Sequence, residues 1–348
     1  MFLRNFWYVA ASDHEVQKRP LGRTILGEPI VFFRTEDGTL AALEDRCAHR
    51  RLPLSMGKVT GDALQCRYHG LRYDRRGKCV RVPGQDLIPS SARVKTYPVA
   101  ERYHWIWVWM GDPALANPDH ITDFHWLDDP AWGAKTAYLY VQANWQLVVD
   151  NLLDLTHLAF VHETTIGNAA LVENATVKVQ RGSDNNVRVT RWMIDTPPPP
   201  TFVKVGGFKS NVDRWQIIDF TPPAFLRLDV GASPTGTGAP EGRREGGISM
   251  RNLNAITPET ETTAHYFWGQ CHDFDVNNPE TTEKIFDQIQ TAFLEDVAVF
   301  QGQQRSINQS PDAPQIDINA DAGAIQARRI IDRLYAEEQA AAHTVAAE

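Results

Sequence analysis

The chain has 348 residues, which is the length of two domains rather than of one compact core. Its 43% hydrophobic and 22% charged residues are typical of a soluble globular protein, and its net charge of -8 provides no basic surface for nucleic acid or anionic membranes. The sequence lacks a membrane-spanning apolar run of roughly 20 residues, and its start lacks a signal-peptide pattern. We therefore expect a cytoplasmic protein whose four cysteines are metal ligands or buried thiols rather than disulfides.

The first part of the chain is predicted to be a small antiparallel β domain. Short β-branched and aromatic runs are separated by turn pairs such as Asp37-Gly38. The proline-rich stretch at 111–120 indicates a boundary, so we expect domains at residues 1–113 and 114–348. The predicted strands of the first domain are WYVA (7–10), PIVFFR (29–34), LAALED (40–45), ALQCRYHGLRYD (63–74), KCVRV (78–82) and HWIWVWMGD (104–112).

The second domain is predicted to combine helices with a larger antiparallel sheet, an α+β arrangement. Apolar residues at helical spacing predict helices at 144–163 and 279–307, and a charged amphipathic helix follows at 324–342. The glycine- and proline-rich segment 231–247 is expected to be either a mobile surface loop near a pocket or a linker. The predicted strands are VKVQ (177–180), VRVTRWMI (187–194), RWQIIDF (214–220), LRLDV (226–230) and AHYFWGQ (264–270).

Two short motifs in the first domain predict a metal centre. Cys47 and His49 form a Cys-x-His motif, and Cys66 and His69 form a Cys-x2-His motif, with sixteen residues between the two. Each motif supplies one thiolate and one imidazole. This donor set suits a [2Fe–2S] cluster in which two cysteines hold one iron and two histidines hold the other.

The alternatives to a cluster are a Cys2His2 zinc site and a coincidence of residues in a reduced protein. Zinc modules more often place two cysteines on one knuckle and two histidines on the other, whereas each motif here is mixed. Gly70 follows the second motif and allows a close approach of the backbone, and VPGQ at 82–85 is expected to form a third, shielding loop. Cys79 and Cys271 have no ligand partner at a useful spacing and are expected to be buried thiols.

The stretch DNLLDLTHLAFVH at 150–162 predicts a second metal site. On a regular helix its polar residues fall in one sector of about 140°, where an isolated buried charge would be costly. The two histidines are five residues apart, wider than the four of a zinc-protease helix, which indicates a distorted helix or ligands that reach from two sides. The residues of this sector are Asn151, Asp154, His157 and His162.

Two histidines need a further protein ligand, and a non-haem iron(II) centre that activates O2 takes a carboxylate while keeping coordination positions open. Asp296 is the best distant candidate because it lies three residues after Phe293 and four before Phe300, on the apolar face of the long helix. Glu295 is turned away by about 100° and is expected at the rim. The alternative is that both histidines are satisfied core residues and that Asp296 is a capped or paired acid.

Together these motifs resemble the oxygenase components of the Rieske non-haem iron oxygenases. The two cysteine–histidine motifs followed by Asp-x2-His-x4-His are highly specific for this family, and the resemblance covers nearly the whole chain. Phrases such as RNFWYVAA, PLGRTILGEPIVF and VVDNLLDLTH are similar to the branch that contains vanillate O-demethylase and toluene-sulfonate monooxygenase. The resemblance implies an all-β Rieske [2Fe–2S] domain, followed by a helix-grip-like antiparallel sheet with helices that holds mononuclear iron.

The resemblance also implies a role for each site residue. It implies a head-to-tail homotrimer in which Asp154 hydrogen-bonds to His69 of one subunit and His157 of the next, orienting the imidazoles and coupling the two metal centres. Asn151 would lie beside the iron site. The implied cluster ligands are Cys47, His49, Cys66 and His69, and the implied iron ligands are His157, His162 and Asp296.

The implied reaction needs a separate flavin and iron–sulfur reductase, which passes electrons from NAD(P)H singly to the cluster and thence to Fe(II). One atom of O2 then enters a methyl or methoxy carbon of an aromatic acid, which yields a benzylic alcohol, or a phenol and formaldehyde. Two alternatives stay open, a ring-hydroxylating dioxygenase that makes cis-diols and an electron-transfer protein without catalysis. Labelled O2 separates the first alternative, and the effect of an Asp296→Ala substitution separates the second.

An aromatic acid requires a cation or hydrogen-bond donors in its pocket. Arg191, Arg227 and Arg251 lie in or beside the strands of the second domain and are candidate partners, although arginines on strands are more often solvated. Asp229 and Asn254 are candidates to reach the pocket from the same sheet.

Overall fold

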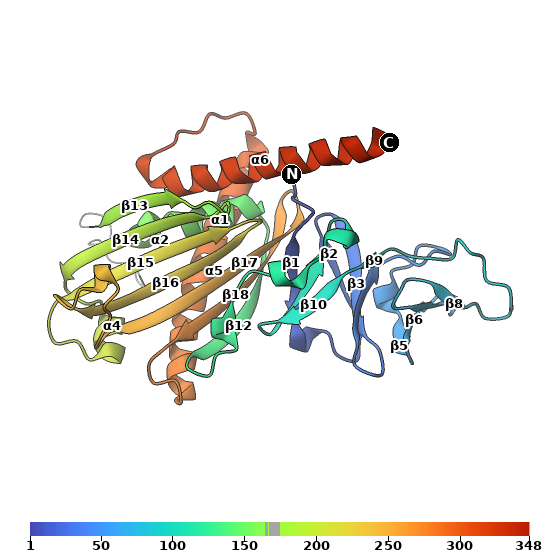
Figure 1. Cartoon of the computed structure of the whole chain (residues 1–348), viewed down its shortest axis with the longest axis horizontal. Helices are drawn as coiled ribbons and strands as arrows, with labels where there is room; N and C mark the ends of the chain where they lie inside the picture. Colours follow the sequence, from blue (N-terminus) through green and yellow to red (C-terminus); the bar gives the residue numbers. More distant parts are fainter. Residues whose placement is uncertain (164–165, 167–174, 348) are drawn as a thin grey trace. The chain divides into compact units, whose positions relative to one another are not determined.

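The computed structural model describes residues 1–163, 166 and 175–347 of the chain (Figure 1). The chain divides into two compact units. The first comprises Met1–Ile121 with Thr257–Thr260, and the second comprises Thr122–Ile256 with Glu261–Glu348. Among the described residues, no helix combines the length and the apolar character that a membrane crossing demands.

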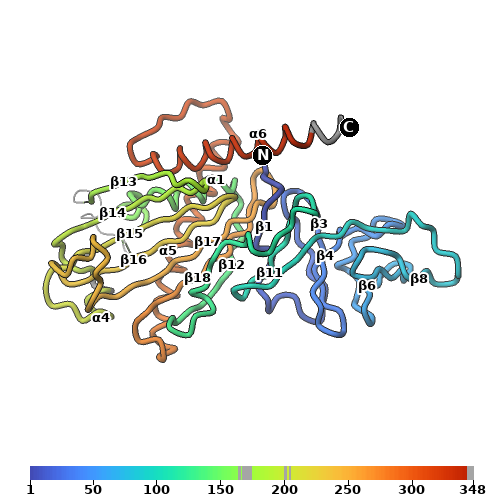
Figure 2. The backbone as a smooth tube through the Cα atoms, viewed as in Figure 1, coloured from blue at the N-terminus to red at the C-terminus, as the bar shows by residue number. Residues whose placement is uncertain are grey.

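The first unit is built from three small antiparallel sheets, coloured from blue to cyan in Figure 2. Their strand orders are β1-β11-β10, β2-β3-β4-β9 and β5-β6-β7-β8. Two apolar clusters fill the spaces beside the sheets, and Tyr8, Phe32 and Val108 lie in the first of them. The strands are β1 (Trp7–Ser12), β2 (Leu21–Ile25), β3 (Glu28–Arg34), β4 (Leu40–Glu44), β5 (Lys58–Thr60), β6 (Ala63–Gln65), β7 (Arg72–Asp74), β8 (Cys79–Arg81), β9 (Thr96–Tyr97), β10 (Val99–Arg102) and β11 (Trp105–Trp109).

The predicted strand at 63–74 is in fact a hairpin. Strand β6 ends at Gln65, β7 begins at Arg72, and the Cys-x2-His motif occupies the connection. The backbone N–H of Cys66 donates to the carbonyl of Leu71 at 2.8 Å, and that of Gly70 donates back to Cys66 at 3.1 Å, which closes the turn. The motif is therefore held at a hairpin tip rather than within a strand.

The second unit contains one seven-stranded antiparallel sheet with helices on one face (Figure 1). Its strand order is β12-β18-β17-β16-β15-β14-β13. The sequence did not predict strands β12 and β17. Strand β17 was missed because it is buried on both faces and because Asn252 and Asn254 interrupt its apolar pattern. The strands are β12 (Gly133–Val141), β13 (Thr176–Arg181), β14 (Val187–Thr196), β15 (Val212–Thr221), β16 (Phe225–Pro234), β17 (Ile248–Thr260) and β18 (Thr263–His272).

The long helix α5 (Pro279–Gln309) packs on the sheet through its apolar face. It begins after Asn278, whose side chain accepts a hydrogen bond from the N–H of Glu280. Phe286 of this helix stacks on Trp268 of β18 with ring centroids 4.7 Å apart. Among the described residues, the other helices are α1 (Trp145–Leu153), α2 (Leu158–Val161), α4 (Pro200–Gly206) and α6 (Ala322–Ala347). The predicted α+β fold class is confirmed.

The predicted helix at 144–163 is broken into three pieces. Helix α1 stops at Leu153, Asp154 adopts an extended backbone (φ -120°, ψ 103°), and a 3-10 turn at Leu155–His157 precedes α2. The Asp154 carboxylate caps the new turn, because it accepts hydrogen bonds from the N–H and the hydroxyl of Thr156 at 2.8 and 2.9 Å. A side chain that competes for backbone donors therefore ends the helix beside the first histidine.

The glycine-rich segment 231–247 is not an interdomain linker. Its first residues complete β16, and the rest forms an ordered connection to β17. Arg244 fixes this connection to the sheet, since its guanidinium lies 4.1 Å from the ring centroid of Trp215 and 2.9 Å from the carboxylate of Asp229. The linker alternative is therefore excluded by these contacts.

Candidate functional site

The four predicted cluster ligands lie on two loops of the first unit. Cys47 and His49 follow β4, and Cys66 and His69 lie between β6 and β7. Both cysteines are buried, whereas both imidazoles are exposed, with their ring centroids 4.6 Å apart. The folded loops therefore bring the two thiols together inside the unit and the two imidazoles together at its surface.

The donors meet as two pairs rather than as one set. The thiols of Cys47 and Cys66 lie within hydrogen-bonding reach of each other, yet no three of the four donor atoms lie within 4.8 Å of one another. A single tetrahedral zinc ion would gather all four donors around one point. Two separated pairs fit a two-iron cluster whose irons are held by different residue types.

Two further residues support these loops. The phenol of Tyr73, which is fully buried, lies 3.3 Å from the sulfur of Cys47 and accepts the backbone N–H of Ala48 at 3.1 Å. Gly70 has a φ of +73°, and a Cβ there would lie 3.0 Å from Pro83 of the predicted third loop. Tyr73 was not singled out from the sequence, because a tyrosine in a strand pattern normally indicates core packing alone.

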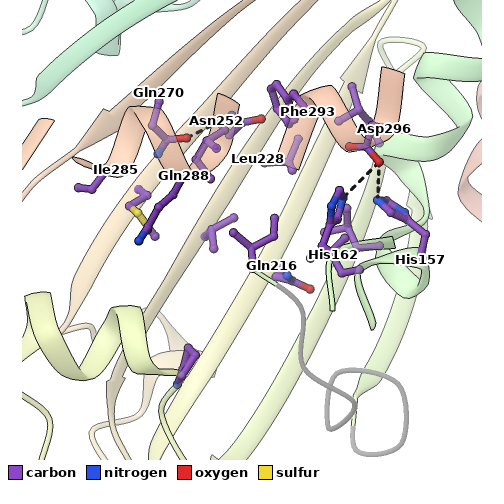
Figure 3. Close-up of a pocket in the computed structure, with 18 of the residues that line it drawn as sticks. His157, His162, Gln216, Leu228, Asn252, Gln270, Ile285, Gln288, Phe293 and Asp296 are labelled. Carbon is purple, nitrogen blue, oxygen red and sulfur yellow. Dashed lines mark hydrogen bonds and ion pairs between the residues drawn. The ribbon is translucent and has the colours of Figure 1, made fainter. Parts of the chain in front are cut away.

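Three side chains from separate segments converge in the second unit (Figure 3). The Nε2 atoms of His162 and His157 lie 3.2 and 3.6 Å from the same atom, Oδ1 of Asp296. Within the described residues, this is the only set of three or more histidine, cysteine or acidic side chains whose donors lie within 4.8 Å of one another. The side chains of His162 and Asp296 are almost completely buried, and that of His157 is 17% exposed.

The opposite nitrogen of each imidazole is already engaged. Nδ1 of His157 donates to the backbone carbonyl of Asp154 at 2.6 Å, and Nδ1 of His162 donates to the carboxylate of Glu295 at 2.7 Å. Each neutral ring therefore presents the lone pair of Nε2 toward Asp296. Lone pairs facing a carboxylate oxygen repel it unless a positive charge lies between them, so the donor set fits a bound iron(II).

The surroundings shift the pKa values of the two histidines in opposite directions. Burial lowers the pKa of His157 below its usual 6.5, although the charge of Asp296 opposes that shift. Burial also lowers the pKa of His162, but the hydrogen bonds and charges of Asp296 and Glu295 outweigh it and leave the pKa raised. A proton therefore competes with the metal more strongly at His162 than at His157.

Glu295 contributes to the site although it lies at the rim, where its side chain is 29% exposed. Helix α5 turns it by about 100° from Asp296, yet the break after α1 brings His162 within reach of both acids. Its carboxylate fixes the ring orientation and the tautomer of His162.

We expect Glu295→Ala to weaken iron(II) binding by about 10- to 100-fold, because His162 then loses the acceptor that holds its Nδ1–H. Glu295→Gln keeps an acceptor oxygen and should lose less. Competitive chelator titration of the iron(II)-loaded protein measures both effects. Equal affinity in the alanine variant and the wild type would contradict this role.

Asn151 and Asp154 flank the triad. The side-chain N–H of Asn151 lies 3.3 Å from Oδ1 of Asp296, so it donates to the third member of the set. Asp154 reaches His157 through its backbone carbonyl, while its carboxylate is occupied by the cap on Thr156. The expected hydrogen bond between Asp154 and His157 thus involves the main chain within this subunit.

A pocket extends from the triad between the sheet and α5 (Figure 3). Most of its wall is apolar, which suits the body of an aromatic ligand. A minority of polar side chains projects from the strands into the same space. The polar lining residues on the sheet are Arg214, Gln216, Asn252 and Gln270, and the apolar ones include Leu155, Leu158, Leu228, Val230, Met250, Ile285, Ile289 and Phe293.

None of the five candidate substrate residues predicted from the sequence is among the described residues that line this pocket. These candidates are Arg191, Arg227, Arg251, Asp229 and Asn254. Arg251 and Asp229 alternate with the pocket-lining positions, so they face the other side of the sheet, where they form an ion pair. Asn254 is fully buried. Its side-chain oxygen accepts a hydrogen bond from the Tyr266 hydroxyl at 2.6 Å, and its side-chain NH2 donates to the side-chain oxygen of Asn252. The alternation of polar and apolar residues along each strand did not reveal which face of the sheet carries the pocket.

The remaining cysteines behave as predicted. Cys79 and Cys271 are buried free thiols, and the chain has no disulfide among its four cysteines. Burial raises the pKa of Cys271 to about 12, which keeps this residue a thiol at neutral pH.

Comparison with known proteins agrees with both sites. Residues 6–98 match the Rieske [2Fe-2S] domain family, and residues 141–337 match the vanillate O-demethylase oxygenase C-terminal domain family. The iron-sulfur subunit TsaM1 of the toluene-4-sulfonate monooxygenase system of Comamonas testosteroni is 45% identical over 97% of this chain and 98% of that protein. A vanillate O-demethylase oxygenase subunit from a Pseudomonas species is 38% identical over 98% of this chain and 97% of that protein.

Solved structures show the same similarity. Dicamba monooxygenase bound to dicamba superposes with a TM-score of 0.88 at 35% identity, covering 97% of this chain and 99% of that one. The same enzyme with non-heme iron and dicamba gives a TM-score of 0.82 at 35% identity, with the same coverage.

Proposed function

Because this chain belongs to the Rieske non-haem iron oxygenases, we propose that it hydroxylates a methyl or methoxy carbon of an aromatic acid. It is an oxygenase component with a Rieske [2Fe–2S] cluster and a mononuclear iron. The observation that carries the proposal is the convergence of two histidine Nε2 atoms and one carboxylate oxygen at the end of a largely apolar pocket. A protein that only transfers electrons has no need of such a pocket.

The chain's own residues perform the positioning in this reaction. His157, His162 and Asp296 would hold the iron, which when bound supplies the activation of O2 with electrons from the cluster. The apolar wall excludes water and holds the aromatic body with the carbon to be oxidised toward the triad. A methoxy carbon that gains a hydroxyl group then breaks down to a phenol and formaldehyde, whereas a ring methyl group becomes a benzylic alcohol.

The proposal extends to the partners. Electrons would come from NAD(P)H through a separate flavin and iron–sulfur reductase, and the protein would act in the cytoplasm in the breakdown of aromatic acids. We also propose a homotrimer in which the cluster of one subunit serves the iron of its neighbour, with Asp154 at that boundary. The similarity to subunits of multicomponent systems supports a reductase partner.

A substrate screen tests the proposed function. The iron-loaded protein, a surrogate reductase, NADH and O2 are incubated with vanillate, 4-methoxybenzoate or toluene-4-sulfonate, and formaldehyde and benzylic alcohol are measured. We expect one of these products, with one atom of labelled O2 in it. Incorporation of both atoms would identify a dioxygenase instead, and no product from any substrate, with the cluster shown to be reduced, would contradict the proposal.

A further inference from the structure

Arg214 is a buried cation inside the pocket. It lies on β15, its side chain lines the pocket together with the iron triad, and it is 7% exposed. Its guanidinium carbon lies 5.1 Å from the ring centroid of Phe202, also in the pocket wall. In the part of the chain that the structure describes, no carboxylate forms an ion pair with it.

Other arginines on or beside this sheet have acidic neighbours. Arg251 of β17 and Arg244 of the β16–β17 connection both pair with Asp229 on the opposite face. Burial lowers the pKa of Arg191, and the charge of Asp154 opposes that shift. For Arg214, no acidic group among the residues that the structure describes contributes a charge that favours its protonated form. Burial and the charge of Arg191 lower its pKa to about 10, which still leaves it protonated at neutral pH. A buried charge without a partner is costly, so the site is completed by an anion that enters the pocket.

Arg214 lies toward the end of the pocket that is far from the triad. Figure 3 shows Ile285 and Asp296 at opposite ends of the view, with Gln216 between them. Arg214 precedes Gln216 on the same face of β15, and its partner Phe202 belongs to the same apolar cluster as Ile285. Ile285 and Asp296 are separated by eleven residues of α5, which is about 16 Å along a helix.

We propose that Arg214 binds the carboxylate or sulfonate group of the substrate and so selects aromatic acids whose acidic group lies opposite the carbon to be hydroxylated. This inference rests on the proposed function. A guanidinium forms two parallel hydrogen bonds with a carboxylate or sulfonate, and the low dielectric of a buried site strengthens them. Gln216, which is 3% exposed, lines the same pocket two residues along β15, and its side-chain NH2 group is a donor that can bind the same anion.

The test measures binding without turnover. Toluene-4-sulfonate and 4-methoxybenzoate are titrated calorimetrically into the anaerobic, iron(II)-loaded protein, beside their neutral counterparts toluene-4-sulfonamide and 4-methoxybenzamide. We expect Arg214→Met to weaken binding of the two anions by about 10- to 100-fold and to change binding of the neutral compounds by less than about 3-fold. Arg214→Lys should retain part of the preference. In the wild type, 2-methoxybenzoate should bind at least about 10-fold more weakly than the 4-isomer.

Arg188→Met is the matched control, because Arg188 lies on the neighbouring strand β14 and pairs with Asp219 on the surface. It should leave all four affinities unchanged. A purely structural Arg214 would instead show itself as a lowered melting temperature and as equal losses for anionic and neutral ligands, and either result would overturn the inference. Anion binding that depends on Arg214 without any hydroxylated product would refute the proposed function alone. Hydroxylation with anion binding independent of Arg214 would refute this inference alone.

Discussion

Asp296→Ala is expected to remove the mononuclear iron and all hydroxylation while leaving the Rieske cluster intact. Asp296 supplies the only carboxylate oxygen within 4 Å of both histidine Nε2 atoms among the described residues, so the variant keeps two neutral ligands and loses the charged one. Iron content should fall from about three to about two atoms per chain. The visible absorbance of the cluster should stay unchanged, because its ligands belong to the other unit.

Asp287→Ala provides the control for this experiment. Asp287 lies on the same helix, nine residues earlier, and its side chain is exposed. Its loss should change neither iron content nor product formation. Metal analysis and formaldehyde or alcohol yield report on both variants. An Asp296→Ala protein that retains its third iron atom would show that another residue holds the metal, and one that still makes product would restore the electron-transfer alternative.

The sequence predicted the convergence of His157, His162 and Asp296 better than the backbone that carries them. The angular argument treated 150–162 as one regular helix, and it placed both histidines in one sector around Asp154. In the structure the helix breaks at Asp154, and this break is what allows a spacing of five to place two Nε2 atoms beside one oxygen. The predicted convergence did not depend on a regular helix, because the unusual spacing had already indicated a distorted one.

Glu295 shows the limit of helical angles as a guide to function. An angle of about 100° from the inward direction predicts a rim position, and the side chain is indeed 29% exposed. However, a carboxylate at the rim can still reach a histidine that approaches from another segment. Such a contact depends on the path of the chain after α1, and the residue pattern of α5 cannot predict that path.

The residues that line the pocket could not be predicted from the pattern of a single strand. The predicted strand RWQIIDF already contained Arg214 and Gln216, two residues apart and thus on one face. The other face carries Trp215, so composition did not show which face points toward the helices. Pairing across the sheet settles this, because Gln216 lies opposite Val230 and Val230 lies opposite Met250, both in the pocket wall.

Asp154→Asn should keep the iron and lower turnover by about 100-fold, if Asp154 connects the two metal centres as we propose. The structure makes this substitution a clean one. Asparagine is as good a helix cap as aspartate, so its side-chain oxygen can still accept the N–H of Thr156. The backbone carbonyl that orients His157 is unaffected by the change. The variant therefore removes a charge and an acceptor oxygen while preserving the local fold.

The decisive measurement follows the cluster during turnover. When electron transfer to the iron is blocked, the cluster should remain reduced in the presence of substrate and O2, whereas the wild-type cluster should reoxidise. Asp150→Asn serves as the control, since Asp150 lies one turn earlier and pairs with Arg328 rather than with the triad. Iron loss from Asp154→Asn would make Asp154 a metal ligand and reverse its assignment with Asp296. Rapid cluster reoxidation in the variant would mean that electrons reach the iron by a route that avoids Asp154.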